Sequence, residues 1–219
     1  MRRRAASSCP TRHLAPLPPA RRGRRDRLPA LPAEGAWTRC QHRHMVELRD
    51  ATPADAYALA TVHVASWRAA YRGLMPDEVL AGLSVPEREQ LWSDRLTAQE
   101  ARTSVVVATD ARRVVGFAAA GPPLVPTDRA DSTLGDLYAL YLDPGRWGRG
   151  IGTPLHAAAL DRLVTDSFTH AGLWVLDGNQ RALRFYHRHG WTDTGRTQID
   201  RGPQDIELHE RRLHRSLSS

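Results

Sequence analysis

No lysine occurs in this sequence: all 31 of its basic residues are arginine. A phosphate loop ending in Gly-Lys-[Ser/Thr] is therefore excluded, since its lysine binds the phosphates. Cys9 and Cys40 are the only cysteines, so residues 45–219 hold neither a disulfide framework nor a thiol nucleophile. No apolar run approaches the roughly 18 residues of a membrane span, and the histidines lack the spacing of metal ligands. We therefore predict no metal site and no membrane span.

Charge is divided unevenly along the chain. Residues 1–44 carry eleven arginines against Asp26 and Glu34, a net charge of +9, while the whole chain carries +7. The remainder is therefore slightly acidic, with a net charge of −2 by difference. The high isoelectric point belongs to the first 44 residues and does not indicate a nucleic-acid surface on the rest.

Residues 1–44 also contain six prolines and no sustained periodicity, so we expect an Arg/Pro-rich disordered tail. Four explanations are open. The segment is an upstream region assigned in error, with Met45 as the true start; a basic tail that binds nucleic acid or anionic surfaces; a targeting peptide; or an inert extension. We expect one domain over residues 45–216, in a cytoplasmic protein.

Hydrophobic patterning predicts alternating strands and helices after residue 45. The expected strands cover residues 45–50, 103–109, 113–120, 134–142, 173–176, 191–196 and 205–213. The expected helices cover residues 53–71, 76–83, 85–96, 151–165 and 179–189. No internal repeat is present.

A glycine-rich turn, Gly148-Arg149-Gly150-Ile151-Gly152, joins an apolar strand to a helix. Glycines let a phosphate approach the backbone, and the helix start offers unpaired N–H groups and a positive dipole end. The dinucleotide fingerprint G-x-G-x-x-G is not formed, because Thr153 and Leu155 stand where its last glycine belongs. The pattern predicts a phosphate-binding loop; a turn that binds no ligand is the alternative.

A second pattern follows: Asn179, Ala182, Tyr186, Gly190 and Trp191, spaced as N-x-x-A-x-x-x-Y-x-x-x-G-[F/W]. Its Asn and Tyr share one face of the predicted helix, because seven residues make almost two turns. Together with the turn, this pattern resembles the GNAT superfamily of acetyl-CoA-dependent N-acetyltransferases, over residues 45–213. The resemblance implies an α/β (α+β) fold, with a mixed, mostly antiparallel sheet of six to seven strands and helices on both faces.

The resemblance also implies how acetyl-CoA binds. Backbone N–H groups from Trp147 to Thr153 would hold the pyrophosphate, and Arg149 would add a charged contact. The pantetheine arm would pair with the strand edge at Leu140 and Leu142, where an N–H group would also polarise the thioester carbonyl. Asn179 would bond to the arm, or act as a helix cap. Trp147 departs from the Arg or Gln of the family. The implied cofactor-binding residues are Leu140, Tyr141, Leu142, Trp147, Gly148, Arg149, Gly150, Ile151, Gly152, Thr153, Asn179 and Tyr186.

Two residues are candidates for proton transfer. The resemblance makes Tyr186 the general acid toward the departing thiolate; otherwise it is a half-buried tyrosine with a satisfied hydroxyl. Asp136 is the candidate general base. The two-residue period of a strand places it on one face with Tyr138, Leu140 and Leu142, and a solvated strand-end carboxylate is its alternative role.

The acceptor site is expected near Trp67 and Tyr71, which lie one helical turn apart. Their rings would hold an amine by cation–π contact, or else pack in the core. The predicted function is acetyl transfer from acetyl-CoA to a primary amine of a small molecule, by direct attack in a ternary complex. The alternative acceptor is a protein N-terminus or a lysine. The alternative function, of a different class, is a catalytically silent acyl-CoA-binding sensor. Nucleic acid is expected to bind only through residues 1–44, and a homodimer is left open.

Overall fold

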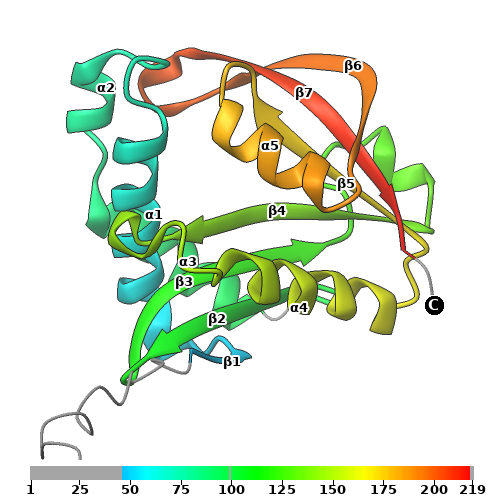
Figure 1. Ribbon diagram of the computed structural model, residues 1–219, viewed down its shortest axis with the longest axis horizontal. Coiled ribbons are helices and arrows are strands. Elements are labelled where there is room, and N and C mark those ends of the chain that lie inside the picture. Colours follow the sequence, from blue (N-terminus) through cyan, green and yellow to red (C-terminus); the bar gives the residue numbers. More distant parts are fainter. Residues whose placement is uncertain (1–45, 99, 218–219) are drawn as a thin grey trace, which may run out of the picture. The chain divides into compact units, whose positions relative to one another are not determined.

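The fold is built on one seven-stranded sheet (Figure 1) in a computed structural model that describes residues 46–98 and 100–217. The strand order is β1-β2-β3-β4-β5-β7-β6. Neighbouring strands are antiparallel except β4 and β5, which are parallel. The strands are β1 (Glu47–Asp50), β2 (Ser104–Asp110), β3 (Arg113–Gly121), β4 (Leu134–Leu142), β5 (His170–Leu176), β6 (Thr192–Arg201) and β7 (Glu207–Ser216). The predicted mixed, mostly antiparallel sheet is confirmed, whereas the prediction for residues 1–44 lies outside the described residues.

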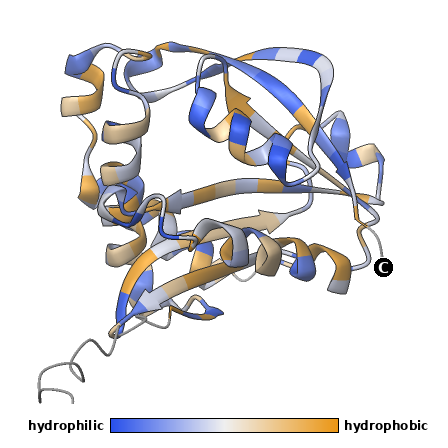
Figure 2. Cartoon of the chain, in the orientation of Figure 1, coloured by the Kyte–Doolittle hydropathy of each residue, from blue (hydrophilic) through white to orange (hydrophobic). Residues whose placement is uncertain are grey.

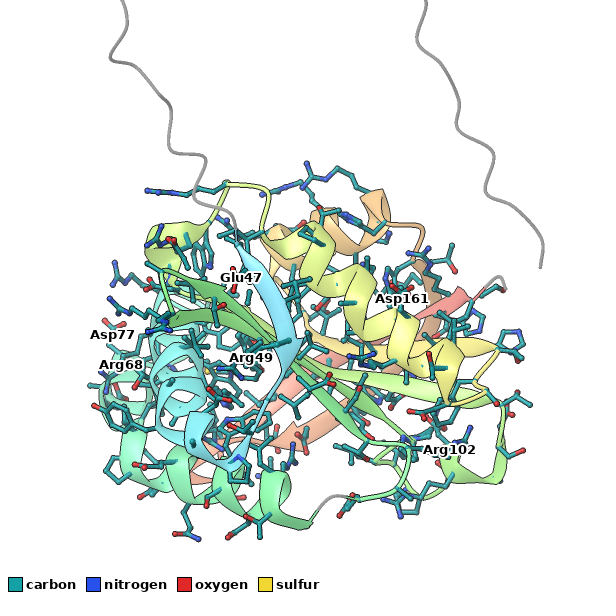
Figure 3. All side chains as sticks on the ribbon, turned by 90° about the horizontal axis from the view of Figure 1, so that it is seen from below. Glu47, Arg49, Arg68, Asp77, Arg102 and Asp161 are labelled. Carbon is teal, nitrogen blue, oxygen red and sulfur yellow. The ribbon has the colours of Figure 1, made fainter. Side chains whose placement is uncertain are left out.

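Helices cover both faces of the sheet, and each face has its own hydrophobic core. They are α1 (Ala56–Ala70), α2 (Asp77–Ala81), α3 (Val85–Ala98), α4 (Gly152–Thr165) and α5 (Gln180–Arg188). Leu59 of α1, Trp92 of α3 and Phe117 of β3 belong to one core, whereas Leu155 of α4 and Leu173 of β5 belong to the other. Seen from below, β1 lies between the two helix layers, with α1 on one side and α4 on the other (Figure 3).

The carboxylate of Asp55 joins the start of α1 to β1. The Asp55 carboxylate accepts the backbone N–H of Thr52 at 2.8 Å. It also accepts two bonds from the guanidinium of Arg49 on β1, each 2.8 Å long (Figure 3 labels Arg49). These bonds stabilise the ionised form, and the pKa of Asp55 falls to about 2, with the Arg49 bond as the largest cause. Strand and helix are thereby joined at neutral pH.

The sheet opens between β4 and β5. Residues 134–136 of β4 pair with residues 170–172 of β5, after which the two strands diverge (Figure 1). On its other edge, β5 pairs with β7 over its full length. The described strands therefore leave the rest of β4 without a partner on this side.

A bulge in β4 changes which side chains share a face. Ala119 and Ala120 of β3 pair with Ala139 and Leu137, so Tyr138 is an extra residue. Beyond the bulge Leu140 packs on the α4 side, while Tyr138 packs on the α1 side. The prediction that Tyr138 shares a face with Leu140 and Leu142 is therefore wrong.

The last strands are longer than the pattern predicted. β5 begins at His170 rather than at residue 173, β6 extends to Arg201, and β7 extends to Ser216. Nearly every residue of β6 is exposed, and Figure 2 shows its ribbon mostly blue and white. Hydrogen bonds to β7 hold this strand in place. Hydrophobic alternation therefore predicts its length poorly.

Candidate functional site

A cleft of about 800 Å³ lies where β4 and β5 separate. One group of lining residues comes from the glycine-rich turn, the free part of β4 and α5, and is called the loop end below. A second group comes from α1, α3 and β7 and is called the acceptor end.

The loop end concentrates backbone donors. After the short 3-10 turn Pro144–Arg146, the chain passes through Gly148 and Gly150, whose φ angles are +73° and +81°. Such angles favour glycine. Among the described residues, the N–H groups of residues 148–152 have no hydrogen-bond acceptor. Because α4 begins at Gly152, its positive dipole end adds to these donors, and the turn fits a pyrophosphate.

Trp147 does not supply the donor predicted for it. Its backbone N–H donates to the Pro144 carbonyl at 3.2 Å, and its indole Nε1 donates to the Leu142 carbonyl at 3.0 Å. The guanidinium of Arg181 lies over its ring, 4.1 Å from the centroid. The ring thus braces the turn against the end of β4. Arg149 is exposed and is not among the residues that line the cleft.

The free edge of β4 faces the cleft. The N–H of Asp143 donates to the Val115 carbonyl on β3 at 2.9 Å. Because hydrogen bonding alternates along an antiparallel pair, Tyr141 also points its backbone to β3, and Leu140 and Leu142 point theirs toward β5. The bond from Trp147 to the Leu142 carbonyl agrees with this direction. The N–H and C=O of Leu140 are therefore available to an extended ligand.

Three residues of the second pattern line the cleft: Asn179, which precedes α5, and Ala182 and Tyr186 on that helix. The Asn179 side chain caps the helix by accepting the Ala182 N–H at 3.1 Å. Tyr186 is half-buried, with its ring 5.9 Å from that of Trp191. Burial, and to a smaller degree the neighbouring Tyr141, raise the pKa of Tyr186. Its hydroxyl therefore keeps its proton at neutral pH.

Glu210 of β7 was not predicted, and its charge acts on two cleft tyrosines. Tyr71, Tyr141 and Glu210 all line the cleft, and the charge of Glu210 raises the pKa of both tyrosines. Burial raises the pKa of Glu210. A hydrogen bond of 2.8 Å from Gln198 lowers it by a smaller amount. The sequence did hold a signal, because Glu210 shares a strand face with the buried Leu208.

Asp136 has a different place from the one predicted. It is only 4% exposed, and Arg212 donates two bonds to it, 2.5 Å and 3.0 Å long. Arg212 reaches it from β7 across Gly172 of β5, where a Cβ would collide with the guanidinium. Burial raises the pKa of Asp136, and Arg212 opposes that shift. Because Asp136 is not among the residues lining the cleft, the prediction that it faces the acceptor is wrong.

The acceptor end has aromatic walls. Trp67 and Tyr71 both line it, in edge-to-face contact at 5.1 Å, and both also touch the core around α2. His63 was not predicted here: it stacks on Tyr141 at 4.8 Å, and its Nδ1 accepts the Trp92 indole N–H at 3.2 Å. Burial is the main cause that lowers the pKa of His63 to about 3, so this imidazole is neutral.

Within residues 46–98 and 100–217, no group of three or more His, Cys, Asp or Glu side chains is placed to hold a metal ion. Over the same residues, no helix combines the length and the apolar character needed to cross a membrane.

Comparison with known proteins identifies the family. Residues 67–191 match the model of the acetyltransferase (GNAT) family. The uncharacterized N-acetyltransferase YuaI of Bacillus subtilis is 34% identical over 143 residues, which cover 65% of this chain and 78% of YuaI.

Solved structures share the fold. The PaiA N-acetyltransferase of Thermoplasma acidophilum, in complex with coenzyme A, has a TM-score of 0.61 at 16% identity, covering 78% of this chain and 99% of that one. YncA of Salmonella typhimurium, with its cofactor acetyl-CoA, has a TM-score of 0.59 at 18% identity, covering 80% of this chain and 95% of that one. This chain therefore belongs to the GNAT family and is an N-acetyltransferase.

Proposed function

We propose that this enzyme transfers the acetyl group of acetyl-CoA to the primary amine of a small molecule, by direct attack with both substrates bound. The unpaired edge of β4, which lies between free backbone donors at the glycine turn and Tyr186 on α5, carries this proposal. An amide-containing arm bonds to such an edge as a strand would. The absence of cysteine after residue 40 supports direct transfer, since no thiol there could carry the acetyl group.

The cofactor would be held by three parts of the cleft. The N–H groups of residues 148–152 would bind the pyrophosphate, the edge at Leu140 would pair with the pantetheine arm, and Asn179 would contact the same arm from α5. Bound acetyl-CoA supplies an acetyl thioester, whose carbonyl carbon accepts an amine. The N–H of Leu140 would polarise that carbonyl oxygen.

Two side chains would move the protons. Glu210 would take a proton from the amine, because its raised pKa makes it a stronger base than an exposed glutamate. Tyr186 would give its hydroxyl proton to the departing thiolate. Burial raises its pKa, so the hydroxyl is still protonated when the thiolate departs, and the proton moves to the sulfur as the carbon–sulfur bond breaks. We propose Glu210 in place of Asp136 as the base.

Calorimetric titration of the full-length protein with acetyl-CoA tests the cofactor, with NAD and ATP as controls. We expect saturable binding of acetyl-CoA alone. A panel of small primary amines then tests the reaction, with release of free thiol as the readout. A folded protein that does not bind acetyl-CoA would contradict the proposal. Binding without thiol release from any amine would favour a silent acyl-CoA sensor.

A further inference from the structure

One face of α3 lines the acceptor end with an unusual set of side chains. Arg88, Leu91, Trp92 and Arg95 follow the i, i+3, i+4, i+7 spacing that places residues on one side of a helix, and all four line the cleft. A helix face that only packs on a core carries apolar residues at these positions. Here an arginine stands at each end of the stripe.

The two arginines are held by aromatic rings rather than by carboxylates. The guanidinium carbon of Arg88 lies 5.6 Å from the centroid of Trp67, and that of Arg95 lies 5.5 Å from the centroid of Trp92. Within the described part of the chain, neither arginine forms an ion pair. Their charge is therefore available to a ligand in the cleft.

His63 adds a second, independent observation at the same place. It lines the cleft and is only 6% exposed. Its Nδ1 accepts the N–H of Trp92, so its Nε2 carries the proton of the neutral ring. That Nε2 is buried and has no hydrogen-bond partner among the described residues. The charges of Arg88 and Arg95 both act on this imidazole, so the α3 side of the cleft is rich in donors.

Negative charge at the acceptor end comes from β7. Glu210 lines the cleft from β7, and its charge raises the pKa of Tyr141, whereas the charge of Arg88 lowers it. The charges of a carboxylate and of a guanidinium therefore both act on Tyr141. The acceptor end is polarised, with a base on the β7 side and two cations on the α3 side.

We propose that the acceptor is an amino acid, whose amine faces Glu210 and whose carboxylate is bound by Arg88 and Arg95. This inference rests on the proposed function and names its substrate class. Arginine suits this role, because its planar fork of donors matches a carboxylate. The aromatic walls formed by Trp67 and Tyr71 favour an acceptor with an apolar or aromatic side chain.

Matched pairs of acceptors test the proposal in the full-length protein. Phenylalanine, tyrosine, tryptophan, leucine and methionine are each compared with their own carboxamide, which keeps the amine and removes the anion. We expect kcat/KM for the best amino acid to exceed that for its carboxamide by at least about tenfold, the scale of a lost charged hydrogen bond. Equal or better use of the carboxamide in every pair would overturn the proposal.

Variants identify the residues. Arg88→Gln and Arg95→Gln should each raise KM for the amino acid about tenfold or more, with kcat and the values for the carboxamide almost unchanged. Arg112→Gln is the matched control: Arg112 is exposed in the turn between β2 and β3 and does not line the cleft. An equal loss for amino acid and carboxamide in the α3 variants would also overturn the proposal, provided that their acetyl-CoA affinity shows intact folding.

Calorimetry separates this inference from the proposed function. The amino acids and their carboxamides are titrated into protein saturated with coenzyme A, so that no turnover is needed. Tighter binding of an amino acid than of its carboxamide, lost in Arg88→Gln, supports the inference even if no acetyl transfer occurs. Equal affinity for each amino acid and its carboxamide would overturn the inference even if other amines are acetylated.

Discussion

Tyr186 is the side chain on which the proposed chemistry depends most. It lines the cleft beside the free edge of β4 and keeps its proton, because burial raises its pKa. We expect Tyr186→Phe to lower kcat by roughly 10²-fold, the scale of a lost general acid. The Kd for acetyl-CoA should change little. Thiol release measures kcat and calorimetry measures Kd; an unchanged kcat would rule out the acid role.

Glu210 determines the expected pH dependence. Its carboxyl group acts as a base only when ionised, and burial raises its pKa. The value of kcat/KM should therefore rise with pH through this raised pKa and level off above it. Glu210→Gln should lower kcat/KM by roughly 10²-fold and remove this rise. Glu207→Gln, an exposed site on the same strand, should keep the profile. A rise that survives in Glu210→Gln would assign the base to another group.

Asp136 is expected to act on stability rather than on catalysis. Asp136→Asn leaves the buried Arg212 without its bidentate partner, so the free energy of unfolding should fall by about 3 kcal/mol. Asp128, at 3.5 Å from Arg212, offers partial compensation. Combining Asp136→Asn with Arg212→Met should restore part of the loss, since no unpaired charge remains buried. Urea unfolding measures both; a single variant as stable as the parent would show that the pair contributes nothing.

The sequence allowed some of these side chains to be placed and not others. Asn179 and Tyr186 lie on one short helix, so their spacing alone brought them together. Asp136 was misplaced for two reasons. A bulge puts Leu140 and Leu142 on the other face of the strand, and Asp136 lies in the part of β4 that still pairs with β5. Glu210 was missed because β7 lies beside β5 only through the long-range order of the sheet.

At the scale of elements, the backbone conformation of the glycine turn is expected to determine the affinity for acetyl-CoA. Gly150 and Gly195 both have positive φ angles, +81° and +76°, and open space where a Cβ would stand. Alanine at either site should cost about 1 kcal/mol of stability through backbone strain. We expect only Gly150→Ala to weaken acetyl-CoA binding as well, by about tenfold, because its turn orients the free N–H groups. Equal acetyl-CoA affinity in the two variants would contradict a binding role for the turn.

Patterning predicted elements best where burial was one-sided. The amphipathic helices and the β-branched strands β2 and β3 follow the expected ranges closely. β5 began earlier than predicted, because His170 is polar and yet belongs to the part that pairs with β4. β6 is almost fully exposed, so its hydrogen bonds rather than its side chains define it.

At the scale of the whole molecule, the first 44 residues should be dispensable for cofactor binding. All residues that line the described cleft fall between His63 and Glu210. A chain that begins at Met45 should therefore bind acetyl-CoA with the same Kd and unfold at the same Tm as the full chain. Calorimetry and thermal unfolding measure these values. Weaker binding by the folded, shortened chain would show that the N-terminal segment contributes to the site.

The fold was predictable because two short motifs identified the family. Periodicity alone supported only a sheet with helices. It could not predict that β4 and β5 diverge, since divergence depends on how β7 and α5 pack far along the chain. The acceptor end was the least predictable part, because α1, α3 and β7 contribute to it from distant segments.

The divergence of β4 and β5 also bears on solubility. An unpaired strand edge normally recruits a strand from another protein molecule, which leads to aggregation. In this molecule the exposed hydrogen-bonding groups of β4 lie inside the sheet, between two strands that are joined at one end. A neighbouring protein cannot slide along them, whereas a single narrow chain can thread in from the open end. The geometry that admits a thin ligand thus also keeps the edge from pairing with other copies of the protein.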